Sequence, residues 1–194
     1  MRSRICSYIV EGNLEAAIKV LNQQKTESAT GKNTREPLFH QYMALSRMTR
    51  LYFENNQPEN GLKSYQDWID FVNNNALRES AKNNVLKLKT YYQTFAYFLK
   101  GNHDLAMSTL DNKQDLSEEE TLLKARILLS KNDIEKAVEV LETLSSTNPY
   151  HLLWLYKAYQ RLGNTQKEQE LILKLKSLIE MNNIDYALAI SKLY

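Results

Sequence analysis

Apolar residues recur at intervals of three and four positions along nearly all of the 194-residue chain. This spacing belongs to one face of an α-helix and differs from the two-residue alternation of a half-buried strand. The segment after Ile134 is typical, with apolar residues on one face and Glu135, Lys136 and Glu139 on the other. Glycine occurs only 5 times and proline 3 times, too seldom for the turns of a many-stranded sheet. The pattern predicts an all-α protein.

Short polar residues and prolines mark the starts of these helices, since the first amide groups of a helix have no partner within it. Two pairs have the spacing of a capping box: Ser117 with Glu120, and Thr165 with Glu168. Other residues suit an N-cap or a first helical position: Asn13, Asp133, Pro37, Pro58 and Pro149. We predict helices over residues 2–11, 14–25, 37–55, 58–73, 76–100, 103–112, 117–130, 133–146, 149–162, 165–181 and 184–193. The polar stretch at residues 25–36 is predicted to be a solvated loop.

One short phrase returns five times along the chain, as EGNLEAAIKVL, NNQPENGLKSY, KGNHDLAMSTL, KNDIEKAVEVL and LGNTQKEQELI. Each copy is a turn rich in Gly or Asn followed by a helix start, which is the signature of a repeat architecture. Four copies have a small residue at one fixed place, where two helices could approach closely: Ala17, Gly61, Ala106 and Ala137. The fifth copy has Glu168 there, as expected of a last repeat without a tight neighbour.

Composition narrows the class of protein further. The formal charge of +2, from 25 basic and 23 acidic residues, is too small to imply a nucleic-acid partner. The only cysteine, Cys6, excludes an internal disulfide and a zinc site built from paired cysteines. No segment reaches the ~20 apolar residues of a membrane span, and the N-terminus does not resemble a signal peptide. We expect a soluble, cytoplasmic protein.

The repeated phrases make the sequence resemble the tetratricopeptide repeat family. Ala137, Leu141 and Pro149 are similar to the family's second-helix pattern, and two triplets are similar to its first-helix pattern: Leu45, Met48 and Tyr52, and Leu152, Leu155 and Tyr159. The chain departs from the family where a first-helix glycine is usual, with Thr49, Thr94, Ala125 and Tyr156. The resemblance implies an α-α superhelix of about five helical hairpins plus a C-terminal helix. It covers residues 1–194 as a single repeat domain, or as the C-terminal part of a longer protein.

Nothing in the sequence indicates catalysis. His40, His103 and His151 lack a second ligand at metal-binding spacing, and no nucleophile elbow or phosphate-binding loop is present. The acidic run at residues 117–120 could be a metal or partner site, but negative charge at a helix start explains it better. We expect a non-enzymatic protein without cofactor or metal.

The segment LKLKTYYQTFAYFL, residues 86–99, permits two interpretations. Two lysines beside five aromatic residues could stack on nucleic-acid bases. Such a dense set also covers most of a helix circumference, as in a helix buried between neighbours. Core packing is the stronger interpretation.

The tetratricopeptide resemblance implies that first helices line a concave surface. Aligning each first helix on its following turn gives eight partner-facing candidates: Arg50, Phe95, Arg126 and Lys157, with Phe53, Phe98, Leu129 and Gln160 nearly one turn further on. We hypothesise that they form a groove for a peptide with acidic and apolar groups. Ordinary solvated cations on exposed helix faces are an equally strong alternative. The carboxylate-clamp pattern of chaperone-binding relatives is not reproduced.

The function expected from the sequence is a non-catalytic adaptor that presents a concave groove to a protein or peptide partner. One alternative is a helical-repeat RNA-binding protein, akin to pentatricopeptide proteins, although the near-neutral charge argues against RNA. Another is a structural or sensor segment of a larger regulator or assembly. DNA and membranes are not expected partners. Repeat proteins expose apolar faces at uncapped ends, so a homodimer through residues 1–11 is a further expectation.

Overall fold

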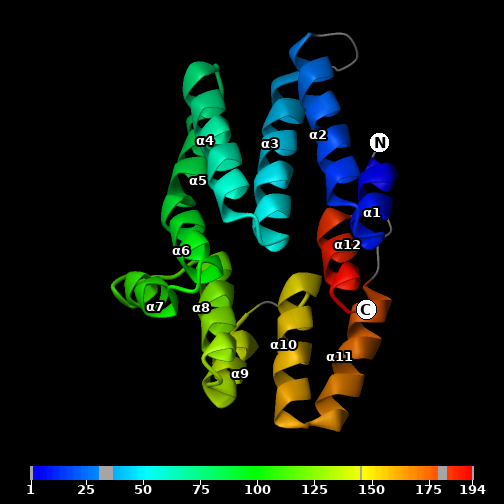
Figure 1. The fold of residues 1–194 in the computed structure, drawn as a ribbon, viewed down its shortest axis with the longest axis vertical. Helices are drawn as coiled ribbons and strands as arrows, with labels where there is room; N and C mark the ends of the chain where they lie inside the picture. The colour runs from blue at the N-terminus through cyan, green and yellow to red at the C-terminus, as the bar shows by residue number, and fades with distance from the viewer. Residues whose placement is uncertain (1, 31–36, 145, 179–182, 194) are drawn as a thin grey trace. The chain divides into compact units, whose positions relative to one another are not determined.

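The computed structural model describes residues 2–30, 37–144, 146–178 and 183–193, and helices are the only regular elements in these ranges. This confirms the all-α, helical-repeat class. The helices shown in Figure 1 are α1 (Arg2–Val10), α2 (Leu14–Ala29), α3 (Pro37–Glu54), α4 (Pro58–Asn74), α5 (Glu79–Lys87), α6 (Lys89–Leu99), α7 (His103–Asp111), α8 (Glu118–Ser130), α9 (Ile134–Glu142), α10 (Pro149–Leu162), α11 (Thr165–Ser177) and α12 (Ile184–Ser191).

Most helix starts follow the capping chemistry read from the sequence. The three prolines begin α3, α4 and α10, and the Asn13 side chain accepts a hydrogen bond from the Ala16 amide at 3.0 Å. Ser117 and Glu120 form the predicted capping box at the start of α8. The second predicted box is wrong, because Asn164 caps α11 by accepting from the Lys167 amide and Thr165 is already helical. An asparagine one position earlier provided the better acceptor.

The loop predicted at residues 25–36 begins later than expected. Helix α2 continues to Ala29, supported on its exposed side by a hydrogen bond of 2.7 Å from the Gln23 amide to the Glu27 carboxylate. On its other side Ser28 is buried. The polar composition of the last turn of α2 was therefore wrongly interpreted as a loop. Polar side chains four positions apart can pair with each other within a helix. Residues 31–36 of the predicted loop lie outside the described residues.

The single helix predicted over residues 76–100 is two helices, α5 and α6, with Leu88 between them. The Leu88 amide donates to the Val85 carbonyl in a tight turn at 3.1 Å. The Tyr65 hydroxyl of α4 donates to the same carbonyl at 2.7 Å. A side chain that enters the helical hydrogen-bond ladder is a known cause of a break, and burial raises the pKa of Tyr65 to about 12.

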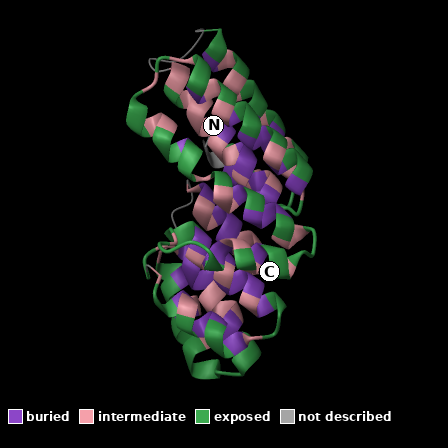
Figure 2. Ribbon diagram, turned by 90° about the vertical axis from the view of Figure 1, so that its left-hand side faces the viewer, coloured by how far each residue is buried: buried purple, intermediate pink, exposed green. Residues whose placement is uncertain are grey.

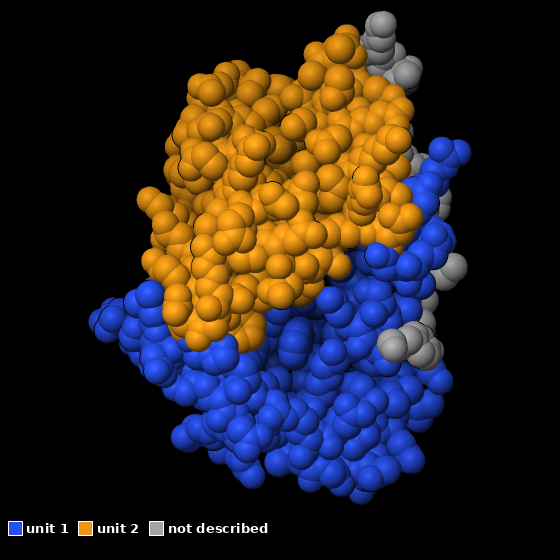
Figure 3. All heavy atoms as spheres, viewed as in Figure 1, with its two compact units in different colours: residues 1–12, 103–194 blue, residues 13–102 orange. Residues whose placement is uncertain are grey.

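The chain divides into two compact units, coloured in Figure 3. Unit 1 comprises residues 1–12 and 103–194, and unit 2 comprises residues 13–102. In unit 2, α3 packs between α2 and α4, and α4 also packs against α5 and α6. In unit 1, the pairs α8–α9 and α10–α11 are helical hairpins, α9 packs against α10, and α7 packs against α8. Each unit thus builds its own core from neighbouring helices.

Helix α12 of unit 1 packs against α10 and against α1, at the other end of the sequence. The packing face of α1 consists of Ile5, Cys6 and Ile9, all buried. The expected homodimer through residues 1–11 stays a prediction, and these three side chains are already covered within the chain.

The small residues of the repeated phrase face the core, and the predicted close approach is seen at Gly61. All four are buried: Ala17, Gly61, Ala106 and Ala137, whereas Glu168 in the fifth copy is partly exposed. A Cβ atom added to Gly61 would lie 2.6 Å from two ring carbons of Phe53. Figure 2 shows buried positions returning along the helices, as the periodic pattern requires.

Candidate protein-binding site

The eight predicted groove residues fall into two groups, one in each unit. Arg50 and Phe53 are on α3, and Phe95 and Phe98 on α6, all in unit 2. Unit 1 holds the others, Arg126 and Leu129 on α8, and Lys157 and Gln160 on α10.

Phe53 and Phe95 do not face a partner, which corrects the prediction for both. Each is only 1% exposed, and their rings stack with centroids 5.1 Å apart. Tyr92 stacks on Phe53 at 5.0 Å. These rings fill the space between α3, α4 and α6, so the core interpretation of the aromatic segment holds for Tyr92 and Phe95. With both rings buried, they are not available for base stacking either.

The other two unit 2 candidates are partly exposed. Phe98 lies at the edge of the aromatic cluster, with its ring centroid 6.3 Å from that of Phe95. Arg50 is partly exposed on α3. Their role in binding stays a prediction.

In unit 1, Leu129 is also a core residue, at 4% exposed. Its side chain is not available to a partner, so this prediction is wrong as well. Its carbonyl accepts a hydrogen bond from the Arg161 guanidinium, which donates as well to the Asn132 side chain at 2.7 Å. Arg161 thereby ties the end of α10 to the turn after α8.

Arg126 and Lys157 meet on the ring of Trp154, a residue that the sequence prediction missed. The Arg126 guanidinium carbon lies 4.6 Å from the ring centroid, and the Lys157 ammonium lies 5.3 Å from it. Both distances suit cation–π attraction. Trp154 and Lys157 are three positions apart on α10, so helical spacing was a usable signal, but nothing in the sequence pointed to Arg126 as the third member.

The three side chains differ in how far they are buried. Arg126 is only 7% exposed, whereas Trp154 and Lys157 are partly exposed. The Trp154 Nε1 is buried and has no hydrogen-bond partner among the described residues. Gln160 is exposed one turn further along α10 and donates to the Tyr156 hydroxyl at 3.4 Å. We call Arg126, Trp154 and Lys157 the cation–aromatic surface.

Helix α10, which carries most of this surface, is tied firmly to α9. The Tyr159 hydroxyl donates a short hydrogen bond to the Glu142 carboxylate. This bond, with burial, raises the pKa of Tyr159 to about 12. The start of α10 is fixed by Asn148, whose side chain accepts from the Tyr150 amide at 2.9 Å. Trp154 and Lys157 thus project from a helix that is anchored at both ends.

The three histidines each lie beside a neutral polar side chain. His40 is 3.4 Å from the Gln24 amide nitrogen, His103 is 3.4 Å from the Ser130 hydroxyl, and His151 is 3.3 Å from the Asn148 amide nitrogen. Across residues 2–30, 37–144, 146–178 and 183–193, no group of three or more His, Cys, Asp or Glu could hold a metal ion.

None of the helices described above is both long and apolar enough to cross a membrane. The acidic run at the start of α8 is a helix cap, as expected. Glu120 accepts from the Ser117 amide at 2.9 Å and from the Lys113 ammonium at 2.6 and 2.7 Å.

Comparison with known proteins finds a family match for part of the chain. A tetratricopeptide repeat model matches residues 122–151, which run from α8 through α9 into α10. No curated protein matches the chain. Two solved structures are similar to it: a Podosopora anserina protein assigned as a kinesin light chain, with nearly identical TPR-like repeats, and a variant of that protein. Both align over 91% of this chain and 92% of their own, at 19% identity and a TM-score of 0.41. Residues 122–151 are a tetratricopeptide repeat, which confirms the resemblance read from Ala137, Leu141 and Pro149.

Proposed function

We propose that the chain is an adaptor whose unit 1 binds an acidic, partly apolar segment of a partner protein. The matched repeat belongs to a family of protein-interaction modules, whose stacked helices act by presenting a binding surface. The observation that carries the proposal is the cation–aromatic surface, where two basic side chains share the ring of Trp154.

The chemistry of this surface favours a peptide with a carboxylate next to an apolar side chain. The Trp154 ring offers a flat apolar contact, and tryptophan and arginine are enriched among residues that dominate interface energies. The positive charges of the Arg126 guanidinium and the Lys157 ammonium beside the ring attract carboxylates. Since Arg126 is largely buried, Lys157 is the cation that first meets a partner.

Arg126 belongs to the matched repeat, and Trp154 and Lys157 follow it on the next helix. The surface therefore spans two consecutive first helices, the elements that face a partner in the family. Arg50 and Phe98 of unit 2 are proposed as a separate set of contacts.

A displayed library of random peptides, selected on the purified chain, tests the proposal. We expect enrichment of peptides that combine Asp or Glu with large apolar residues. Trp154→Ala should weaken binding of a selected peptide at least roughly 30-fold, the loss typical of a central interface residue. Lys157→Glu should weaken it about 5-fold or more, because attraction becomes repulsion.

Lys167→Glu is the matched control, since Lys167 is an exposed lysine of the same unit on the second helix α11. Its affinity should equal that of the wild-type chain. Enriched peptides without acidic residues, or equal binding by the Lys157→Glu and Lys167→Glu variants, would contradict the proposal. Salt-sensitive binding of single-stranded RNA instead would favour the RNA alternative.

A further inference from the structure

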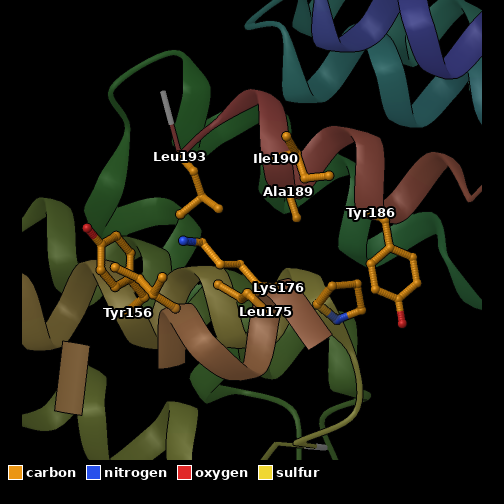
Figure 4. A pocket seen from close by; sticks show the side chains of 9 residues that line it. Tyr156, Leu175, Lys176, Tyr186, Ala189, Ile190 and Leu193 are labelled. Atoms are coloured by element: carbon orange, nitrogen blue, oxygen red, sulfur yellow. The ribbon is translucent and has the colours of Figure 1, made fainter. Parts of the chain in front are cut away.

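Unit 1 contains a cleft of about 300 Å³ among α10, α11 and α12, shown in Figure 4. It is separate from the cation–aromatic surface. Its walls include Tyr156 of α10, Ile172 and Leu175 of α11, and Ile190 of α12. Its volume is at the lower end of the range of ligand sites.

The α12 side of the cleft carries an apolar stripe. Tyr186 and Ile190 lie one turn apart on α12, and Leu193 follows shortly after the helix ends at Ser191. All three are partly exposed, whereas Leu188 on the other side of α12 is buried. Helix α12 is held by its contacts with α1 and α10, so the stripe faces the cleft from a fixed support.

Among the described residues that line the cleft, Lys176 of α11 is the one with a charged side chain. Figure 4 shows its side chain extending along the cleft, with the ammonium turned toward Tyr156 and Leu193. The remaining surface is almost entirely aliphatic or aromatic. One cation at the rim of an apolar space is complementary to a molecule with an apolar body and one negative group.

We propose that this cleft binds a small amphipathic carboxylate, with its apolar body between α11 and α12 and its carboxylate at Lys176. A positively charged amphiphile would be repelled by Lys176. A neutral one would gain the apolar burial without the ion pair. The proposal is independent of the protein partner, because none of the cation–aromatic residues contributes to the cleft walls.

Decanoate, below its micelle concentration, is the probe, and decanol and decyltrimethylammonium are its neutral and cationic counterparts. Calorimetric titration of the wild-type chain should show one site per chain that prefers decanoate to decanol about 5-fold, as expected for a partly exposed ion pair. Decyltrimethylammonium should bind more weakly than decanol. Absence of decanoate binding, or equal affinity for decanoate and decanol, would overturn the proposal.

Lys176→Glu and Lys174→Glu make a matched pair, since both are exposed lysines in the last turn of α11 and only Lys176 lines the cleft. Lys176→Glu should weaken decanoate about 5-fold or more and remove the preference over decanol. Lys174→Glu and Lys157→Glu should leave both affinities unchanged. Equal effects of the two α11 variants would overturn the assignment of the carboxylate to Lys176.

Ile190→Glu tests the apolar wall, and its partly exposed position permits folding. It should abolish binding of both decanoate and decanol while the circular dichroism spectrum stays helical. Retained binding of decanoate by this variant would place the ligand outside the cleft.

Discussion

Unit 2 and unit 1 both contain polar links between helices, such as the Tyr65 bond to Val85 in unit 2, but unit 2 also has a cluster of packed aromatic rings in its core. Phe53 of α3 stacks on Tyr92 and Phe95 of α6, and Tyr65 of α4 lies 4.8 Å from Tyr92. In unit 1, polar side chains tie helix to helix. Lys124 of α8 and Lys131, directly after this helix, each pair with an aspartate of α7 at 2.7 Å. The Tyr159 hydroxyl of α10 donates to the Glu142 carboxylate of α9.

The contrast teaches how aromatic residues are used in the two cores. In unit 2, α3, α4 and α6 contribute closely packed rings to one core cluster, and other aromatic side chains, such as Phe39 and Tyr97, are exposed. In unit 1, the core is mainly aliphatic, and the aromatic residues Trp154, Tyr156 and Tyr186 stay partly exposed.

The largest effect is expected where the aromatic core of unit 2 is broken. Phe53→Ala should lower the free energy of unfolding by about 3–5 kcal/mol, since it removes a fully buried ring and leaves a cavity. Hydrogen exchange of α3, α4 and α6 amides should speed up accordingly. Phe98→Ala, at the partly exposed edge of the same cluster, should cost clearly less. Equal losses from the two variants would show that the stacked rings are not the core of this unit.

A smaller loss should follow from adding one methyl group to unit 2. Gly61→Ala should destabilise by about 1–3 kcal/mol because the new Cβ meets the Phe53 ring, although alanine favours a helix by up to about 1 kcal/mol. Chemical denaturation measures the change. In a Phe53→Leu background the same substitution should cost less, and additive losses in the double variant would contradict the contact.

In unit 1, the loss of a buried polar contact should lower the free energy of unfolding. Glu120 is 1% exposed and accepts hydrogen bonds from Ser117 and Lys113, so Glu120→Ala should cost about 2 kcal/mol in chemical denaturation. Glu119→Ala, at the next position but exposed, should stay within about 0.5 kcal/mol of wild type. A loss from the Glu119 variant as large as that from the Glu120 variant would indicate a general charge effect.

The smallest effect concerns two tyrosines, one in each unit. The pKa values of Tyr65 and Tyr159 are both raised from 10.0 to about 12, by burial in unit 2 and chiefly by the Glu142 hydrogen bond in unit 1. A raised pKa means that the fold favours the neutral hydroxyl. This stabilisation is complete below about pH 10 and disappears as the pH rises through about 12.

Tyrosinate absorbance should therefore include two groups, Tyr65 and Tyr159, that titrate near pH 12. Tyr65→Phe and Tyr159→Phe should each remove one of them. Near neutral pH, Tyr159→Phe should lower stability by about 1 kcal/mol, and the difference from wild type should vanish in strong alkali. A titration curve unchanged by Tyr159→Phe would contradict the role of Glu142.

Local chemistry made much of the fold predictable from the sequence. Caps and prolines placed most helix starts, and the small residue of the repeated phrase located close packing at Gly61. The break at Leu88 was not predictable, because it depends on the Tyr65 hydroxyl arriving from another helix. The pairing of α1 with α12 likewise has no local signal.

The candidate site was predicted less well than the fold. The candidates were chosen by aligning each first helix on the turn that follows it, as the tetratricopeptide resemblance suggests. Whether a side chain at such a position faces a partner depends on how many helices surround it. Phe53 and Phe95 are enclosed in the aromatic core, and Leu129 is buried in the core of unit 1. Lys157 stays accessible because it lies over Trp154 at the surface of α10. Residue type alone could not distinguish the buried candidates from the accessible one.

The pairing of α1 with α12 sets the order of events during synthesis. Helix α1 ends at Val10 and α12 begins at Ile184, so roughly 10–35 seconds of translation separate them at about 5–20 residues per second. Throughout that interval Ile5, Cys6 and Ile9 lack their final partner. Unit 2 is encoded entirely within the gap and can assemble first. Unit 2 can therefore assemble while Ile5, Cys6 and Ile9 of α1 still lack their contact with α12.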